Sequence, residues 1–288
     1  MKAQQLLVAS AAMVAAQDAE PTPEAFDWTS LKASKSLDYT DCYDGFKCAK
    51  LSVPLDLKNE TDSRMISIAV MTLPAVVDED DETFGGTIFV NPGGPGGAGT
   101  DFIPALGRHM QVTFDIPDEK HYEILSWDPR GVGYSEPRAD CYPGNEPARN
   151  MAMYEVRAAG GSGRDNRTIP LQYGLADAFA LQCQAADQDA DIMSYTTTPA
   201  VVGDMLEILD RIEDNRQGSR KRRGLKCRDT KEKARMQYVG FSYGAALGQY
   251  LLTMHPERVS RIVLDGVASA DEYANKEVRT TFPGPSLR

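Results

Sequence analysis

The chain has few histidines and lacks the common metal, nucleotide and membrane motifs. Three of its 288 residues are histidine. No C-x-x-C or H-E-x-x-H pattern indicates a zinc site, and no G-x-x-x-x-G-K-[ST] pattern indicates a phosphate-binding loop. No apolar run approaches the roughly 18 residues of a membrane-spanning helix, and no internal repeat is present. We therefore expect no metal, no cofactor and no membrane partner.

Positive charge is scarce outside one segment. The chain carries 31 basic and 42 acidic residues, a formal net charge of −11. Residues 216–235 hold ten of the basic residues and two acidic ones, so the rest of the chain is more acidic still. An acidic body argues against nucleic acid as a partner. We predict that residues 216–235 form a basic inserted loop, solvated and disordered. A nuclear signal or a proprotein cleavage site at Arg220–Arg223 is the alternative.

The first forty residues have the composition of a secretory leader followed by a linker. A lysine precedes an apolar run over residues 6–16 that ends in small residues, and an acidic stretch with two prolines follows. This pattern predicts a signal peptide over residues 1–19, cut near Ala16 or Ala19, and a linker over residues 20–40. A short buried helix is the alternative. The expected location is extracellular, and two glycosylation sequons fit surface loops of a secreted protein, at Asn59 and Asn166.

Secretion changes the interpretation of the five cysteines, because disulfides persist in oxidising compartments. Cys42 and Cys48 lie close together in sequence and can close a small loop. Cys141 and Cys183 flank a polar segment that contains glycine, and Cys227 is left over. We predict a Cys42–Cys48 disulfide and an unpaired Cys227.

The motif around which the chain is organised is Gly240–Gly244, which reads G-F-S-Y-G. Before it, Met236–Val239 has the β-branched and aromatic content of a buried strand. After it, Ala245–Leu252 indicates a helix, which ends before a His-Pro pair. A strand, a G-x-S-x-G motif and a helix together form a nucleophile elbow, a strained turn that exposes the serine hydroxyl. We predict that Ser242 is a nucleophile; a plain glycine turn is the alternative.

A second glycine-rich segment, Asn91–Gly99, follows a short apolar strand expected at Thr87–Val90. In a hydrolase, the loop after such a strand places a backbone N–H against the oxyanion that develops during acyl transfer. Side chains there must be small, which explains the glycines. We predict an oxyanion loop, with a structural turn and a nucleotide-binding loop as alternatives.

The rest of the pattern alternates strands and helices. Two strands that open the domain are expected to pair antiparallel, at 49–54 and 65–70. Later strands are expected at 87–90, 122–127, 236–239 and 261–265, and helices at 100–110, 172–186 and 198–214. The helix capped by Thr198 carries an apolar stripe at Val202, Met205, Leu206, Leu209 and Ile212, which indicates core. The alternation predicts an α/β fold with a mostly parallel sheet and an antiparallel start.

The turn at Asp128–Ser135 holds an acidic and a basic residue beside the predicted site. We expect Asp128 and Arg130 to pair with each other and brace this turn. A structural role is favoured over a catalytic one.

Four motifs taken together resemble a known family. N-P-G-G-P-G-G, S-W-D-P-R-G-V-G-Y-S-E-P, G-F-S-Y-G and P-E-R-V-S-R-I-V-L-D-G-V are similar to the secreted tripeptidyl-aminopeptidase-like branch of the α/β-hydrolases, which is related to the proline iminopeptidases. The resemblance implies an α/β-hydrolase fold and exopeptidase action on peptide N-termini. It also implies a nucleophile, two backbone donors of an oxyanion hole and a disulfide, at Ser242, Gly94 with Tyr243, and Cys141 with Cys183.

An acid and a base to complete a catalytic triad are not recognisable. In this fold the triad runs serine, acid, histidine in chain order. Only His255 follows Ser242, and 13 residues of helix separate them by roughly 20 Å, against the ~3 Å that a general base needs. His109 and His121 precede the serine and have no evident catalytic role. Asp265 is interpreted as a turn cap, with triad acid as the alternative.

We therefore expect residues 41–288 to be the N-terminal part of an α/β-hydrolase domain, truncated before the cap and the last strands. The predicted function is that of a serine hydrolase, an exopeptidase that forms an acyl-enzyme, with a peptide or small ester as substrate. This chain is expected to be inactive by itself, as a fragment or as a natural inactive form. A carboxylesterase and a non-catalytic secreted binding protein are the alternatives.

Overall fold

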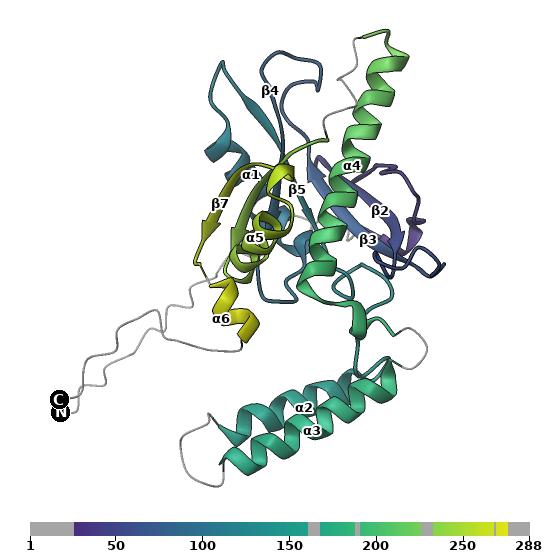
Figure 1. Ribbon diagram of the computed structural model, residues 1–288, viewed down its shortest axis with the longest axis vertical. Coiled ribbons are helices and arrows are strands. Elements are labelled where there is room, and N and C mark those ends of the chain that lie inside the picture. The colour runs from purple at the N-terminus through teal and green to yellow at the C-terminus, as the bar shows by residue number, and fades with distance from the viewer. Residues whose placement is uncertain (1–25, 161–167, 188–190, 226–232, 268, 276–288) are drawn as a thin grey trace, which may run out of the picture.

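The computed structural model of the protein describes residues 26–160, 168–187, 191–225, 233–267 and 269–275. The predicted signal peptide, the first residues of the linker, the sequon at Asn166 and the leftover Cys227 lie outside these ranges. The described residues form one seven-stranded sheet with helices on both faces and a helical hairpin that projects from it (Figure 1).

The sheet opens antiparallel and continues parallel, as the sequence predicts. Its strand order is β1-β2-β3-β5-β4-β6-β7. β2 pairs antiparallel with β1 and β3, and β3 pairs antiparallel with β5, whereas β5, β4, β6 and β7 run parallel. The strands are β1 (Thr40–Cys42), β2 (Phe46–Pro54), β3 (Met65–Leu73), β4 (Phe84–Asn91), β5 (His121–Trp127), β6 (Met236–Phe241) and β7 (Val259–Asp265).

Each predicted helix is present and is longer than its sequence pattern indicates. The helices are α1 (Gly99–Phe114), α2 (Glu146–Ala159), α3 (Thr168–Ala186), α4 (Thr198–Arg222), α5 (Tyr243–Met254) and α6 (Ala270–Asn275), with 3-10 turns at Trp28–Ser30, Met193–Tyr195 and Pro256–Arg258. In Figure 1, α4 and α5 lie in front of the sheet and α1 lies behind it. The helices therefore form two outer layers around the strands.

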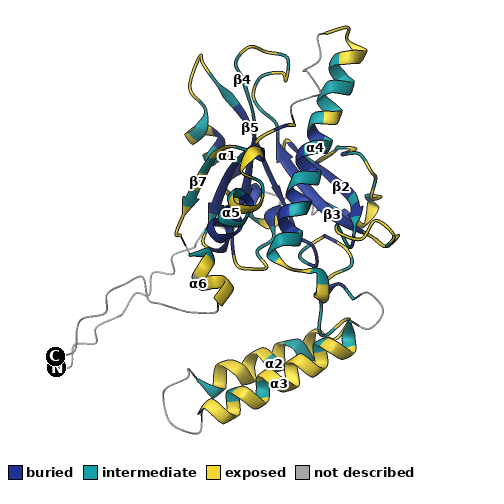
Figure 2. Ribbon diagram, viewed as in Figure 1, coloured by how far each residue is buried: buried dark blue, intermediate teal, exposed yellow. Residues whose placement is uncertain are grey.

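The core lies on both faces of the sheet, which explains why its central strands are largely apolar (Figure 2). Along β2, Leu51 and Val53 pack on one face, whereas Phe46 and Cys48 pack on the other. This is the period-2 alternation of a strand. The cluster that contains Leu51 and Val53 also includes apolar residues of α4 and α5. The cluster on the other face, which contains Phe46 and Cys48, includes Ile103 of α1. Strands covered on both faces read as continuous apolar runs.

Helix α4 corrects one boundary of the sequence analysis. Its predicted apolar stripe is in the core, with Met205 and Ile212 buried, but the helix continues to Arg222. The basic residues from 216 to 222 are therefore helical and do not belong to a loop. Arg216 shows the reason, because its guanidinium pairs with Glu79 and Glu123. The sequence of these basic residues is typical of a solvated segment. In the fold, however, carboxylates from distant segments pair with Arg216 at its start. Residues 226–232 lie outside the described ranges.

The start of α4 is also shifted by one residue. The N-cap is Thr197, whose hydroxyl accepts a hydrogen bond from the Ala200 N–H at 3.4 Å, and Thr198 is the first helical residue. Proline at the second helical position is compatible with this start, because the first N–H groups of a helix have no partner within it. The shift leaves the Thr198 hydroxyl available for a contact at the site described below.

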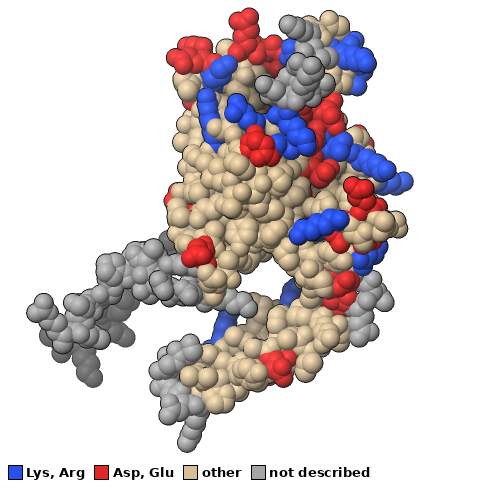
Figure 3. Space-filling model, viewed as in Figure 1, with Lys and Arg blue, Asp and Glu red and all other residues tan. Residues whose placement is uncertain are grey.

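The predicted Cys42–Cys48 and Cys141–Cys183 disulfides are both confirmed. The second bridge joins the base of the α2–α3 hairpin, whose helices are mostly exposed (Figure 2). Much of the hairpin surface is uncharged in Figure 3, and its exposed large apolar residues include Met151, Tyr154, Val156, Tyr173, Phe179 and Leu181. In the part of the chain that the structure describes, no helix is both long and apolar enough to cross a lipid bilayer.

Candidate active site

Ser242 lies at the carboxyl edge of the parallel strands, where β4 and β6 end side by side. β4 leads into α1 on one face of the sheet, and β6 leads into α5 on the other. Such a switch leaves a crevice outside the carboxyl ends of the strands, where ligands of open α/β sheets bind. The glycine-rich loop follows β4 and Ser242 follows β6, with Asn91 opposite Gly240 in the register. The fold therefore brings together the two segments that the sequence predicts to form a site.

The backbone at Ser242 has the strained conformation of a nucleophile elbow. Its φ of 54° and ψ of −118° are rare for a residue with a side chain. The Ser242 N–H donates to the Asp265 carbonyl oxygen at 2.9 Å, and the Ser242 carbonyl accepts from the Ala245 N–H at 2.9 Å. These bonds hold a conformation that costs on the order of 1–3 kcal/mol. The residue is exposed and directly precedes α5, whose N-terminus carries partial positive charge.

The elbow is too compact for side chains at its flanking glycines. A Cβ on Gly240 would lie 2.2 Å from the Gly244 carbonyl oxygen, and a Cβ on Gly244 would lie 2.7 Å from the Asn91 carbonyl oxygen. The Tyr238 hydroxyl donates to the same Gly244 oxygen at 2.7 Å. The G-x-S-x-G spacing is therefore a packing requirement of this turn.

The glycine-rich loop lies directly against the elbow. A Cβ on Gly93 would be 2.4 Å from the Phe241 carbonyl oxygen and 3.2 Å from the Tyr243 nitrogen. The Gly93 N–H donates to Oδ1 of buried Asn91 at 3.0 Å, which anchors the start of the loop. Gly94 follows, with a φ of 121°. Within the described part of the chain, neither the Gly94 N–H nor the Tyr243 N–H donates a hydrogen bond to another protein group.

A cleft of about 530 Å³ opens beside Tyr243. It lies between the glycine-rich loop at Gly96, the turn that follows β5 and the start of α4. The Tyr243 hydroxyl and the Thr198 hydroxyl are hydrogen-bonded at 2.9 Å across the junction of α5 and α4. Burial raises the pKa of the Tyr243 phenol, so this contact is made by the neutral side chain. The sequence pattern indicates only a helix cap at Thr198 and gives no sign of this contact.

Asp128 braces the turn beside the site, but with other partners than expected. Its carboxylate accepts hydrogen bonds from the Thr100 N–H at 2.9 Å and from the Tyr134 N–H at 2.7 Å. The side chain therefore joins the N-terminus of α1 to the turn after β5. Burial raises the pKa of Asp128, although these hydrogen bonds to the carboxylate oppose the shift. The expected structural role is supported, since Asp128 contacts the loop scaffold.

Arg130 does not pair with Asp128, and that expectation is wrong. Its guanidinium forms a bidentate pair with Asp204 of α4, with Nη2 2.6 Å from Oδ1 and Nε 2.8 Å from Oδ2. Both side chains are fully buried. Arg130 Nη1 also donates to the Leu55 carbonyl oxygen at 2.8 Å. Asp204 is 74 residues away in sequence, so proximity in the chain favoured the wrong carboxylate.

The three histidines lie away from Ser242, as the sequence analysis argues. His255 caps the far end of α5, and His121 begins β5 at the amino edge of the sheet, where its Nδ1 is 2.9 Å from Asp115 Oδ2. His109 lies in the second half of α1, whose first residues adjoin the glycine-rich loop. Asp265 ends β7 with an exposed side chain and contacts Ser242 through backbone. Among the described residues, no cluster of three or more His, Cys, Asp or Glu side chains could hold a metal ion.

Comparisons with known proteins agree with this geometry. No protein-family model matches the chain. The chain is 27% identical over 263 residues to a tripeptidyl aminopeptidase of Streptomyces lividans, covering 88% of this chain and 43% of the relative. It is 25% identical over 244 residues to the serine protease Hip1 of Mycobacterium tuberculosis, covering 83% of this chain and 39% of the relative. The chain thus spans about two fifths of the length of these curated relatives.

The predicted resemblance to tripeptidyl-aminopeptidase-like serine hydrolases is confirmed. The chain contains a mostly parallel sheet, a strand–serine–helix turn and an adjoining glycine-rich loop, which belong together in one known fold. That fold is the α/β-hydrolase fold. A shorter match, 36% identical over 95 residues, joins 33% of this chain to 16% of carboxylesterase B of Mycobacterium tuberculosis. Among solved structures, an epoxide hydrolase of Vigna radiata is 14% identical with a TM-score of 0.33, covering 75% of this chain and 38% of that chain.

Proposed function

We propose that this chain is the nucleophile-bearing part of a secreted serine hydrolase of the peptidase type. The observation that carries the proposal is the conformation of Ser242, an exposed serine held at positive φ between a buried strand and a helix N-terminus. In such an elbow the hydroxyl attacks an acyl carbon and forms an acyl-enzyme, which water then hydrolyses. The two disulfides are compatible with an extracellular location.

The backbone N–H groups of Gly94 and Tyr243 are proposed to form the oxyanion hole. In this fold one donor belongs to the residue after the nucleophile and another to the glycine-rich loop. The contact between Gly93 and the Tyr243 backbone supports the assignment, because it brings the loop against the elbow. Donors fixed before the reaction stabilise the developing charge, and removing one costs roughly 10²–10³-fold in rate.

The proposed substrate is a peptide, cleaved near its N-terminus. This specificity rests on the relatives, one of which is named a tripeptidyl aminopeptidase and another a serine protease. The cleft supports a site of this kind, since its lining includes Tyr243, the residue after the proposed nucleophile, and Gly96 of the glycine-rich loop. A carboxylesterase is the second candidate, favoured by the 36% identity to carboxylesterase B over 95 residues.

The chain is proposed to lack catalytic turnover by itself. A serine hydroxyl is a weak nucleophile unless a base lies within hydrogen-bond reach. The three histidines of the sequence all lie on elements that keep them away from Ser242. The proposed role is therefore to present the nucleophile and the oxyanion donors, without the base.

Labelling with a fluorophosphonate tests the function. Imidazole is added to supply the missing base, and the adduct is mapped by mass spectrometry. A single adduct on Ser242, absent from Ser242→Ala and retained in Ser30→Ala, supports a serine hydrolase elbow. An unlabelled, folded chain supports the non-catalytic binding protein instead. Under the same conditions, tripeptidyl anilides and short-chain p-nitrophenyl esters distinguish a peptidase from an esterase.

A further inference from the structure

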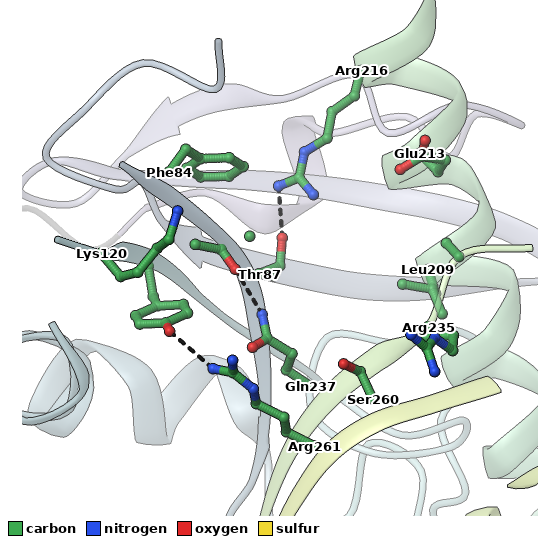
Figure 4. A pocket seen from close by; sticks show the side chains of 14 residues that line it. Phe84, Thr87, Lys120, Leu209, Glu213, Arg216, Arg235, Gln237, Ser260 and Arg261 are labelled. Carbon is green, nitrogen blue, oxygen red and sulfur yellow. Dashed lines mark hydrogen bonds between the residues drawn. The ribbon is translucent and has the colours of Figure 1, made fainter. Parts of the chain in front are cut away.

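A second cavity lies at the amino edge of the parallel strands, opposite the edge that holds Ser242. Its volume is about 340 Å³. The starts of β4, β5, β6 and β7 form its floor, and α4 forms one wall (Figure 4). The proposed hydrolase site uses the opposite ends of the same strands, so this cavity has no part in it.

The cavity is lined by more positive than negative charge. Lys120, Arg235 and Arg261 line it, and within the described part of the chain none of the three pairs with a carboxylate. Lys120 Nζ donates to the Glu82 carbonyl oxygen at 2.8 Å, and Arg261 Nη1 donates to the Tyr122 hydroxyl at 3.2 Å. Each cation therefore has N–H groups beyond those contacts. Figure 3 shows Lys and Arg side chains gathered, with some acidic ones, across the upper part of this face.

A fourth cation, Arg216, has its charge matched already. Its Nε lies 3.0 Å from Glu79 Oε1, and its Nη2 lies 2.7 Å from Glu123 Oε2. Glu213 is the one acidic residue in the lining, and its Oε1 accepts from Gln217 Nε2 at 2.9 Å. The hydrogen bond from the neutral Gln217 amide does not cancel the charge of Glu213. Apart from Arg216, the lining therefore carries three cations and one carboxylate, an excess of positive charge.

Two glycines keep the cavity open beside these cations. Gly85 and Gly86 lie at an irregularity in the pairing of β4 with β5, and Gly86 has a φ of 93°. A Cβ on Gly85 would lie 2.4 Å from the ring of Tyr122, so a larger residue would displace the phenol that contacts Arg261. A ligand can therefore approach the backbone of β4 beside Lys120, which directly precedes β5, and Arg261 of β7.

We propose that this cavity binds a small ligand that carries a phosphate group. Three cations without a carboxylate partner, of which Arg235 and Arg261 are exposed, favour an anion with more than one charge, and a phosphate monoester carries nearly two at neutral pH. Guanidinium groups match its oxygens with parallel hydrogen bonds, and an ammonium adds a point charge. The hydroxyl of Ser260, also in the lining, adds a donor. A volume of about 340 Å³ suits one small molecule.

Inorganic phosphate is the probe for the test, with the full chain. Melting temperature is measured against phosphate concentration at constant ionic strength, with chloride and sulfate series beside it, because a ligand of the native state raises stability by mass action. We expect a saturable rise with phosphate at pH 7.5, and a weaker one at pH 5.5, where phosphate is mostly a monoanion. Isothermal titration calorimetry gives the dissociation constant.

The variant Lys120→Gln/Arg261→Gln should weaken phosphate binding at least roughly tenfold, because it removes two charged donors. Lys47→Gln/Arg108→Gln loses the same charge at exposed positions elsewhere and should bind as the parent chain does. The proposal is overturned if phosphate gives no saturable rise. It is also overturned if chloride or sulfate matches phosphate, which shows an adventitious ion only, or if both variants lose binding equally. Ser242 labelling is indifferent to either variant, so the two proposals fail separately.

Discussion

The backbone N–H of Ser242 donates a hydrogen bond to the carbonyl oxygen of Asp265, the last residue of β7. The bond joins the elbow to the strand that follows the next helix, so the position of the proposed nucleophile depends on residues far ahead in the chain. It also gives Asp265 a role through its main chain, while its carboxylate is exposed. The interpretation of Asp265 as a turn element is supported by this contact.

Because the glycine-rich loop contacts the elbow, alanine substitutions at two similar glycines of the loop should differ in their effect on stability and on labelling. Gly93 and Gly96 both have φ near 97°, yet a Cβ on Gly93 would clash with the Phe241 carbonyl oxygen, whereas a Cβ on Gly96 would meet nothing within 4 Å. Gly93→Ala should lower the free energy of unfolding by roughly 2–3 kcal/mol and sharply lower the rate of Ser242 labelling. Gly96→Ala should cost roughly 1 kcal/mol and keep the labelling. Urea denaturation and imidazole-assisted labelling measure both; equal losses would show that the loop does not touch the elbow.

Removing one member of the buried pair of Arg130 and Asp204 should greatly lower the free energy of unfolding. Replacing both members by apolar residues should restore most of it. Asp204→Ala leaves a buried guanidinium without its carboxylate and should destabilise the chain by about 3–5 kcal/mol. Arg130→Met/Asp204→Leu should recover most of that loss, because no uncompensated charge remains. The exposed pair partner Arg211→Ala is the control, with an expected loss under about 1 kcal/mol. If Asp204→Ala behaves like the control, the pair does not hold α4 to the turn after β5.

The raised pKa of Asp128 predicts a pH dependence of stability. Burial favours the protonated carboxyl in the folded state, so the folded chain binds a proton that the unfolded chain, with its ordinary pKa of 3.8, releases first. The contribution of Asp128 to stability is therefore largest below pH 3.8 and declines as pH rises through its higher folded value. Asp128→Asn cannot titrate, so the free-energy difference between parent and variant should shift against the parent from pH 3.5 to pH 7. A constant difference, measured by urea denaturation, would contradict the raised pKa.

Removal of one disulfide should mainly affect local resistance to proteolysis, whereas removal of the other should mainly affect the global melting temperature. A chain-entropy estimate assigns roughly 4 kcal/mol to Cys141–Cys183 and roughly 2.4 kcal/mol to Cys42–Cys48. The longer bridge, however, closes a hairpin whose two helices hold one buried residue, Thr168, among those described. Cys141→Ser/Cys183→Ser should therefore speed proteolysis between residues 141 and 183, with little change in global melting.

Cys42→Ser/Cys48→Ser is the comparison, because both of its positions are buried in the core. It should lower the melting temperature and leave the hairpin as resistant as in the parent. The opposite ranking of melting temperatures would show that the hairpin folds together with the sheet.

Much of the fold follows from local sequence patterns, because each is set by a few adjacent residues. The elbow could be predicted from the spacing of Gly240 and Gly244, although only Gly240 avoids a clash within the turn itself, whereas Gly244 makes room for Asn91 of β4. The doubly buried strands could be predicted from their apolar runs. The Arg130–Asp204 pair and the ordering of Arg216 by Glu123 could not, because each joins residues that only the finished fold brings together. A charged side chain needs a partner only when the fold buries it, and the sequence leaves both the burial and the partner open.

The most direct test of the account is the rate of fluorophosphonate adduct formation at Ser242, measured with and without imidazole. The account predicts little adduct and no measurable peptide turnover without imidazole, because no histidine of the chain reaches the serine. It predicts a rate that increases with imidazole concentration, vanishes in Ser242→Ala and falls sharply in Gly93→Ala. Ser242-dependent peptide turnover without imidazole would show that the chain supplies its own base. Equal labelling of the parent and Ser242→Ala would contradict the central claim that Ser242 is the nucleophile.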